Sequence, residues 1–147
     1  MGKNIIIAST STIHGGDYLD YLLDDLKNHF EKCKTILFIP FARPGGVTHE
    51  DYTAKVSLAF AKIGKEVKGI HEFEDYSNAI KNAEGIFTGG GNTFLLVTQL
   101  YKNNIMNVLA DVVKNGTPYL GTSAGSNICG LIMQNTSDMS FIFPSSF

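Results

Sequence analysis

A serine between two glycines follows an apolar segment late in the sequence. The stretch "GTSAGSN", residues 121–127, fits the pattern G-x-S-x-G around Ser123, and "TPYL" precedes it. A serine at a sharp turn from a strand into a helix holds its hydroxyl away from the sheet, and the start of the helix offers free N–H groups to a developing oxyanion. This arrangement fits acyl transfer with Ser123 as the nucleophile. A serine there can also act only as the N-cap of the helix.

Three successive glycines follow an earlier apolar segment, in "TGGGNTF" at residues 88–94. A backbone without side chains can turn its N–H groups toward an anion or a carbonyl oxygen. The alternative is a tight turn with Asn92 as the N-cap of the next helix. Together, the glycines and Ser123 predict hydrogen-bond donors and a nucleophile in one site.

Apolar, β-rich segments alternate with helical patterns along the chain. Strands are expected at residues 4–9, 35–41, 66–70, 85–89 and 118–122. Helices are expected at residues 17–32, 49–64, 76–83, 92–116, where a break near "KNN" makes two helices, and 124–132. The pattern predicts an α/β fold, with a doubly wound, mostly parallel sheet flanked by helices. Ligands of such sheets bind at the rim, which is the edge formed by the carboxyl ends of the strands and the loops that follow them.

The composition favours one domain that acts on a small molecule. With 147 residues, of which 44% are hydrophobic, residues 1–147 can form a single α/β domain with a real core. The net charge of −2, without basic runs, argues against nucleic acid and membrane surfaces as partners. Cys33 and Cys129 have no metal or redox spacing, so we expect buried thiols. The short apolar run at the N-terminus fits neither a signal peptide nor a membrane span, and we expect a cytoplasmic protein.

Several stretches of the chain together resemble the peptidase E family of aspartyl dipeptidases, with the cyanophycinases as more distant relatives. They are "STST", "FIPFA", "DYTAKV", "GIHEFED", "GGGNTF", "GTSAGSN" and "NTSDM", in family order over nearly the whole chain. The glycine run before Asn-Thr-Phe and the Ser-Ala-Gly turn are specific in combination. The resemblance implies a fold like that of class I glutamine amidotransferases, of flavodoxin-like type. It also implies a serine-type dipeptidase that removes N-terminal aspartate from short peptides without a metal or a cofactor.

The resemblance also implies roles for individual residues. The predicted site comprises Ser123 as the nucleophile, Gly90, Gly91 and the Ala124 amide as oxyanion donors, Asn92 as a substrate-binding residue, and Asp138 as the acidic member of a triad. An aspartate in the polar loop around Asp138 can equally be a turn former. In the family, the catalytic histidine and a basic residue that reads the aspartate side chain lie downstream of the serine. Here, the four histidines His14, His29, His49 and His71 all precede Ser123.

We therefore expect this chain to be the N-terminal part of a C-terminally truncated catalytic domain, inactive by itself. The strand at 118–122 is expected at an exposed edge of the sheet, where it would favour association into a homo-oligomer. A non-catalytic α/β module that binds a small molecule or a peptide at the rim is the alternative. An esterase of the α/β-hydrolase type needs an acid and a histidine after the serine, and no histidine follows Ser123.

Three of the upstream histidines remain open as bases. His14, His49 and His71 lie in or beside the predicted rim loops, so their positions do not exclude them. His29 falls near the end of the first predicted helix, and we expect it to have a surface role.

Overall fold

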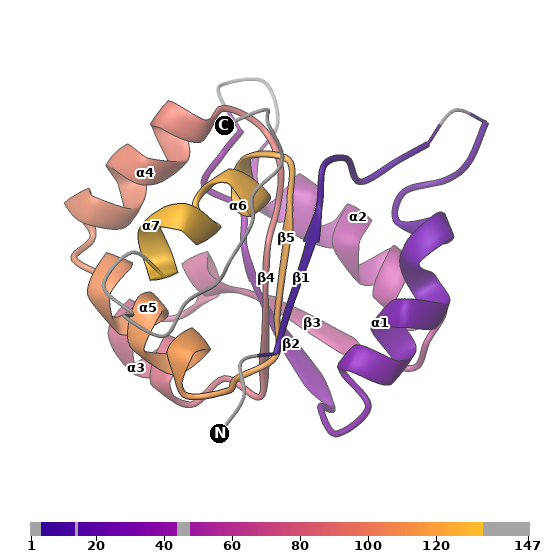
Figure 1. Cartoon of the computed structure of the whole chain (residues 1–147), viewed down its shortest axis with the longest axis horizontal. Coiled ribbons are helices and arrows are strands. Elements are labelled where there is room, and N and C mark those ends of the chain that lie inside the picture. The colour runs from indigo at the N-terminus through magenta and orange to yellow at the C-terminus, as the bar shows by residue number, and fades with distance from the viewer. Residues whose placement is uncertain (1–3, 14, 44–47, 134–147) are drawn as a thin grey trace.

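A parallel sheet stands between two layers of helices in the computed structural model, which describes residues 4–13, 15–43 and 48–133. Its strands are β1 (Ile5–Ala8), β2 (Thr35–Ile39), β3 (Glu66–Gly69), β4 (Gly85–Thr88) and β5 (Tyr119–Thr122), in the spatial order β1-β5-β4-β2-β3. All four pairings are parallel. The carboxyl ends of the strands, and so the rim, lie at the top of Figure 1. The predicted α/β fold with a parallel sheet is confirmed.

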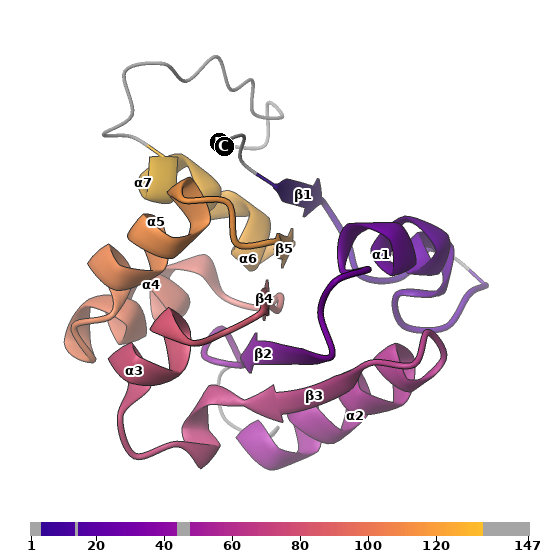
Figure 2. The ribbon, with the colours of Figure 1, turned by 90° about the horizontal axis from the view of Figure 1, so that it is seen from below.

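The helices divide between the two faces of the sheet. One face carries the 3-10 turn η1 (Asp20–Leu22), α1 (Leu23–His29) and α2 (His49–Ala61) (Figure 2). The other carries α3 (Tyr76–Lys81), α4 (Thr93–Lys102), α5 (Met106–Lys114), α6 (Ala124–Asn127) and α7 (Cys129–Met133), and a 3-10 turn η2 (Ile70–Glu72) follows β3. The predicted break near "KNN" is confirmed, because Asn104 has a φ of 57° between α4 and α5. The predicted helix at 17–32 is shorter, since Leu19 has a φ of 62° and delays its start.

Each face of the sheet has its own core because side chains alternate along every strand. On β4, Phe87 points toward α1 and α2, and Ile86 points toward α3, α4 and α5. Both side chains are fully buried, because helices cover both faces of the sheet at β4. Aromatic rings fill the first core: the centroid of Phe87 lies 5.1 Å from that of Phe38 and 5.8 Å from that of Phe60. Close packing on both faces gives the rim loops a rigid base.

The position of β5 differs from our expectation. Tyr119 of β5 pairs with Ile5 on one side and with Ile86 on the other, so β5 lies inside the sheet. The prediction of an exposed edge at β5 is therefore wrong, because β1 pairs with the side of β5 that faces away from β4. Among the described residues, the edge strands are β1 and β3. Homo-oligomer formation through a sheet edge stays a prediction.

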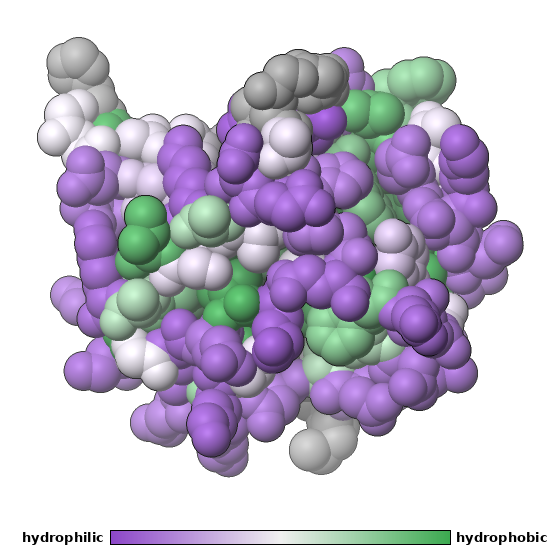
Figure 3. Space-filling view, turned by 180° about the vertical axis from the view of Figure 1, so that it is seen from behind, coloured by the Kyte–Doolittle hydropathy of each residue, from purple (hydrophilic) through white to green (hydrophobic). Residues whose placement is uncertain are grey.

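The face of the molecule that carries β3 and α2 is mostly hydrophilic. Figure 3 shows its hydrophobic residues in small patches separated by hydrophilic ones. Two large apolar side chains are exposed on α2, on β3 and in the turn after β3. They are Leu58 of α2, which is 73% exposed, and Phe73 after β3, which is 37% exposed. Single exposed apolar side chains are common on soluble domains and do not by themselves mark an interface.

The two cysteines are buried and free, as predicted. Burial raises the pKa of the Cys129 thiol to about 12, so this thiol stays protonated and is a poor nucleophile. In the described ranges, none of the helices has the length and apolar character needed to cross a membrane.

Candidate active site

Ser123 forms a strained turn between β5 and α6, as predicted. Its φ of 51° and ψ of −113° lie outside the regions that residues with a side chain favour, which costs about 1–3 kcal/mol. Hydrogen bonds hold the turn from both sides. The Ser123 N–H donates to the Ala8 carbonyl at 2.9 Å, and the Ser123 carbonyl accepts from the N–H groups of Ser126 and Asn127, each at 3.0 Å. The half-buried serine is therefore fixed by backbone that belongs to β1 and to α6.

Small residues let α6 pack directly on the end of the sheet. A methyl group on Gly125 would clash with the backbone carbonyl of Thr88 at the end of β4, and one on Gly121 would clash with the Gly125 carbonyl. The buried hydroxyl of Tyr119 donates to the same Gly125 carbonyl at 3.2 Å. The glycines of the "GTSAGSN" motif thus allow α6 to pack closely on the sheet, and this packing places Ser123 at the end of β4.

The glycine loop, residues 89–91, lies directly against Ser123. A Cβ atom on Gly90 would be 2.9 Å from the Ser123 Cβ and 3.5 Å from its Oγ, so a side chain there would occupy the space of the nucleophile. Gly91 has a φ of 145°, which other residues rarely adopt, and it lies against the Ala42 carbonyl after β2. The next amide, of Asn92, donates to that carbonyl at 2.7 Å. The structure therefore brings the predicted Gly90 and Ser123 together.

Three backbone N–H groups at this place have no acceptor in the described part of the chain. Those of Gly90 and Gly91 make no hydrogen bond to the described residues. The N–H of Ala124 opens α6, where an amide has no partner within its own helix. Unengaged N–H groups beside a serine hydroxyl are the donors that an oxyanion of acyl transfer requires. Their roles as oxyanion donors stay predictions.

The described histidines make no hydrogen bond to Ser123. In the half-buried His29, Nε2 lies 3.0 Å from the Tyr119 carbonyl, so the expected surface role does not describe it well. The His49 ring packs against Phe41 and His71, with centroids 5.3 and 5.5 Å away. Burial, and then the neighbouring His71, lower the pKa of His49. Among the described residues, no side chain accepts or donates a hydrogen bond to the Ser123 hydroxyl.

Two of the predicted residues have no described position. His14 and Asp138 both lie outside the described residues. The triad role of Asp138 therefore stays a prediction. The same holds for His14 as a possible base.

Asn92 has the structural role that the sequence left open as an alternative. Its side-chain oxygen accepts from the Leu95 N–H at 2.9 Å and caps α4. The first residue of α4 is also tied to α6, because the Asn127 side-chain amide donates to the Thr93 hydroxyl at 3.1 Å. The cap fixes the direction in which α4 leaves the glycine loop. A substrate-binding role for Asn92 stays a prediction.

Two tyrosines, one on α2 and one in the turn before η1, support the glycine loop, which sequence reasoning missed. The buried Tyr52 of α2 donates its hydroxyl to the Gly90 carbonyl at 3.2 Å, and the Tyr18 hydroxyl lies 3.5 Å from that of Tyr52. Burial, and then Tyr52, raise the pKa of Tyr18 far above its usual range, so its hydroxyl stays protonated. Arg43 lies over the Tyr52 ring, 4.9 Å from the centroid. The sequence signal for Tyr52, in "DYTAKV", indicates only a buried aromatic residue.

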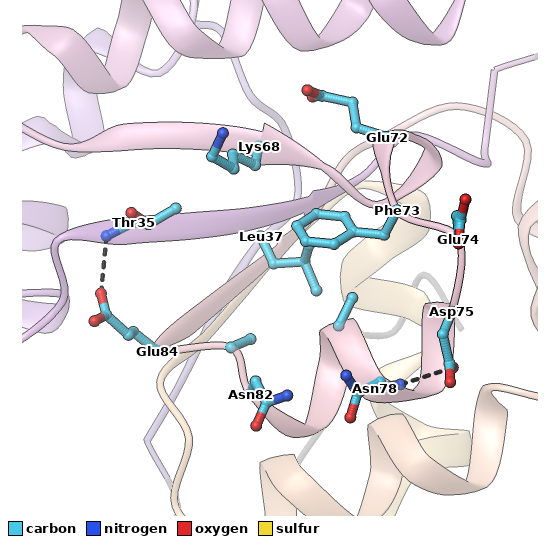
Figure 4. Close-up of a pocket in the computed structure, with 12 residues that line it drawn as sticks. Thr35, Leu37, Lys68, Glu72, Phe73, Glu74, Asp75, Asn78, Asn82 and Glu84 are labelled. Carbon is cyan, nitrogen blue, oxygen red and sulfur yellow. Dashed lines mark hydrogen bonds between the residues drawn. The ribbon is translucent and has the colours of Figure 1, made fainter.

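A cavity of about 590 Å³ lies elsewhere, between β2, β3 and α3. The ring of Phe73 points toward Leu37 across it, and carboxylates surround it (Figure 4). Glu84 accepts from the N–H groups of Lys34 and Thr35, and Asp75 caps α3. None of the lining residues belongs to the glycine loop or to the turn at Ser123. Within the described ranges, no cluster of three or more His, Cys, Asp or Glu side chains could hold a metal ion.

Comparison with known proteins assigns the chain to a family. The model of peptidase family S51 matches residues 5–147. The chain belongs to peptidase family S51. Proteins named Peptidase E from Shewanella denitrificans and Nostoc sp. are 39% and 40% identical to it, over all of this chain and 62% and 61% of their own lengths. This S51 chain thus spans about three fifths of the curated relatives that it matches.

Solved structures show the same fold at low sequence identity. A peptidase from an acI-B1 Actinobacterium superposes with a TM-score of 0.67 at 19% identity, covering 84% of the S51 chain and 55% of its own. A protein from Listeria monocytogenes EGD-e gives a TM-score of 0.62 at 22% identity, covering 94% of the S51 chain and 71% of its own. The predicted flavodoxin-like arrangement is thereby confirmed.

Proposed function

We propose that this S51 chain is the N-terminal part of a serine-type dipeptidase that hydrolyses Asp-X dipeptides with Ser123 as the nucleophile. The observation that carries the proposal is the strained Ser123 turn, which faces unengaged N–H groups of the glycine loop and of α6. Strain at a nucleophilic serine between a strand and a helix is typical of hydrolases that form an acyl-enzyme. Membership in family S51 and the Peptidase E names of its relatives support a peptidase.

The proposed reaction uses the rim in two stages. A base takes the proton of the Ser123 hydroxyl, Oγ attacks the scissile carbonyl, and the N–H groups of Gly90, Gly91 and Ala124 stabilise the resulting oxyanion. The peptide bond then breaks, the amine leaves with a proton, and water hydrolyses the acyl-enzyme. Each donor that is already in place can contribute about 10²–10³ in rate, because it needs no reorganisation.

The base is the part of this mechanism that the described residues lack. A serine hydroxyl is a weak nucleophile at neutral pH until a positioned base accepts its proton. The family resemblance implies a histidine downstream of Ser123, with Asp138 as its acidic partner. We therefore propose that the 147-residue chain alone has little activity, since triads that lose a member retain only about 10³–10⁴-fold catalysis over water.

Hydrolysis of Asp-Ala by a version of the protein that continues past residue 147, as the curated relatives do, tests the proposal. Ser123→Ala should abolish turnover without loss of fold, measured by release of aspartate and by circular dichroism. Ser57→Ala is a matched control, since Ser57 is a half-buried serine of α2 outside the rim. Turnover that survives Ser123→Ala would show that another group is the nucleophile. Binding of Asp-Ala without turnover in the longer version would favour the non-catalytic binding module.

A fluorophosphonate that labels activated serines tests where the base comes from. We expect the longer version to be labelled at Ser123 much faster than the 147-residue chain. Equal labelling of both would place the base upstream, at His14, His49 or His71. Cytoplasmic location and self-association of the protein are separate proposals, which the same material can test by fractionation and light scattering.

A further inference from the structure

Arg43 lies at the rim beside β2 and β4, two neighbouring strands that continue to helices on opposite faces of the sheet. It follows Ala42, whose carbonyl accepts from the Asn92 N–H at 2.7 Å and lies against Gly91. After β2 the chain continues to α2 on one face, and after β4 it continues to α4 on the other face (Figure 2). In doubly wound sheets, ligands bind in the crevice that such diverging loops form. Arg43 therefore stands at the part of the rim that this topology makes available to a ligand.

The guanidinium of Arg43 lies over the ring of Tyr52. Its central carbon lies 4.9 Å from the centroid of the Tyr52 ring. Tyr52 cannot shift easily, because it is 2% exposed and its hydroxyl donates to the Gly90 carbonyl. A cation–π contact holds the charge near the ring without an oxygen acceptor, and a guanidinium carries five N–H donors that can bind such acceptors. The Tyr52 ring thus fixes where the Arg43 guanidinium lies.

Arg43 has no anionic partner among the residues that the structure describes. The ion pairs recorded there join Lys62 to Asp17 and Asp20, and His71 to Glu50. No side-chain or backbone oxygen of the described ranges accepts a hydrogen bond from Arg43, although the residue is half-buried. A half-buried cation is usually paired, because lost hydration must be replaced. Arg43 lies over Tyr52 beside the loop that contacts Ser123, and it has no ionic or hydrogen-bond partner within residues 4–13, 15–43 and 48–133.

We propose that Arg43 binds a carboxylate of the peptide substrate through its guanidinium fork. The inference rests on the proposed peptidase function and specifies which charge of the substrate the described rim reads. A planar fork of donors fits a carboxylate with two parallel hydrogen bonds, and lysine cannot reproduce that geometry. An Asp-X dipeptide carries two carboxylates, on the aspartate side chain and at its C-terminus. Arg43 binds one of them, and Tyr52 links this contact to Gly90 and so to the nucleophile.

Binding to the 147-residue chain tests the inference without any need for turnover. The probes are Asp-Ala, Ala-Ala, which lacks the side-chain carboxylate, and Asp-Ala amide, which lacks the C-terminal one. We expect Arg43→Gln to weaken Asp-Ala binding about 10–100-fold by NMR titration, as for loss of charge-assisted hydrogen bonds. Arg43→Lys should weaken it less. The probe that lacks the recognised carboxylate should bind equally to wild type and Arg43→Gln, which distinguishes the two sources.

Lys55 provides a matched control on the neighbouring helix. Its ammonium lies 4.8 Å from the centroid of the Tyr18 ring, yet the residue is exposed. Lys55→Gln should change the dissociation constant less than about twofold. Equal binding of Asp-Ala to wild type and Arg43→Gln, or no binding to wild type, would overturn the inference. Either result would leave the Ser123 hydrolysis experiment to decide the proposed function by itself. If Arg43→Gln fails to fold, unchanged affinity in Arg43→Lys would also overturn it.

Discussion

The rim around Ser123 and the cavity beside α3 use their polar groups in opposite ways. At the rim, three N–H groups and one guanidinium have no partner in the described part of the chain, and the backbone is strained. In the cavity, the carboxylates of Glu72, Asp75 and Glu84 each accept from backbone N–H groups, and no backbone strain is recorded for the lining residues. These three cavity carboxylates thus have partners, whereas the rim groups have none among the described residues.

This difference shows which features point to chemistry in this fold. A volume of about 590 Å³ is large enough for a ligand, but its carboxylates already stabilise turns and helix ends. Unengaged donors and a strained turn cost stability, and such features persist mainly where a function requires them. The unengaged hydrogen-bond donors and the strained backbone angles, and not the cavity volume, therefore mark the rim around Ser123 as the candidate active site.

Filling the space under the Ser123 turn should cause the largest loss of stability. Gly125→Ala would push a methyl group into the Thr88 carbonyl, which is backbone and cannot move aside easily. We expect the free energy of unfolding to fall by about 3 kcal/mol, measured by urea denaturation. Gly16→Ala is the control, since its Cβ would meet the Ile13 carbonyl at an ordinary 3.5 Å, and it should change stability by less than about 1 kcal/mol. Equal urea midpoints for both variants would contradict tight packing at the rim.

Removing one hydroxyl should have a smaller effect on the rim. Tyr52→Phe leaves the Gly90 carbonyl without its donor, and we expect a loss of about 1–2 kcal/mol in the free energy of unfolding. Tyr101→Phe removes a hydroxyl from a side chain that is 56% exposed and should change stability by less than about 0.5 kcal/mol. Thermal denaturation of the pair measures the difference. A loss in Tyr52→Phe no larger than in the control would show that the tyrosine does not support the glycine loop.

The cavity offers the smallest effect, and one that depends on pH. The N–H groups of Thr35 and Lys34 lower the pKa of Glu84 below 4.5, because they favour its charged form. A lowered pKa means that Glu84 stabilises the fold above its unfolded pKa, and that this stability disappears as the pH falls through the folded pKa. Glu84→Gln should therefore be less stable than wild type near neutral pH, with a gap that closes as the pH falls through the folded pKa of Glu84.

Urea midpoints across that pH range measure the gap. Glu74→Gln is the control, since the exposed Glu74 accepts no hydrogen bond from the described residues. It should follow wild type at every pH. A gap between wild type and Glu84→Gln that widens toward acid would show that the Glu84 carboxylate does not stabilise the cavity wall.

The sequence predicted those features that depend on neighbouring residues in the chain. The strands and the turn at Ser123 follow from local apolar runs and from small residues, so their positions agree with the structure within a few residues. The order of the strands was not predictable in this way. β5 lies beside β1 because the two segments pair across most of the chain, and no local pattern encodes that partner.

The candidate site was predicted in part for the same reason. Gly90 and Ser123 belong to recognisable motifs, whereas Tyr52 reaches the rim only through the packing of α2 against the sheet, and Arg43, in the loop after β2, contacts the Tyr52 ring only because of that packing. In the sequence, Tyr52 cannot be distinguished from any other buried aromatic residue, and Arg43 cannot be distinguished from any other cationic residue in a loop. Asn92 shows the converse, since its motif suggested chemistry and its side-chain oxygen caps α4.

The pairing of β1 with β5 also determines when the site can form during synthesis. β1 leaves the ribosome first, but its partner in the sheet is the last strand of the described chain, and the Ser123 N–H bonds to Ala8 at the end of β1. Contacts between such distant segments form slowly, because a long loop must close before they gain any stability. The isoleucines of β1 therefore have no partner strand until residue 122 has emerged. Until then they can bind chaperones or aggregate. The geometry of the nucleophile then forms only when β5 joins the sheet, after the other four described strands have been synthesised.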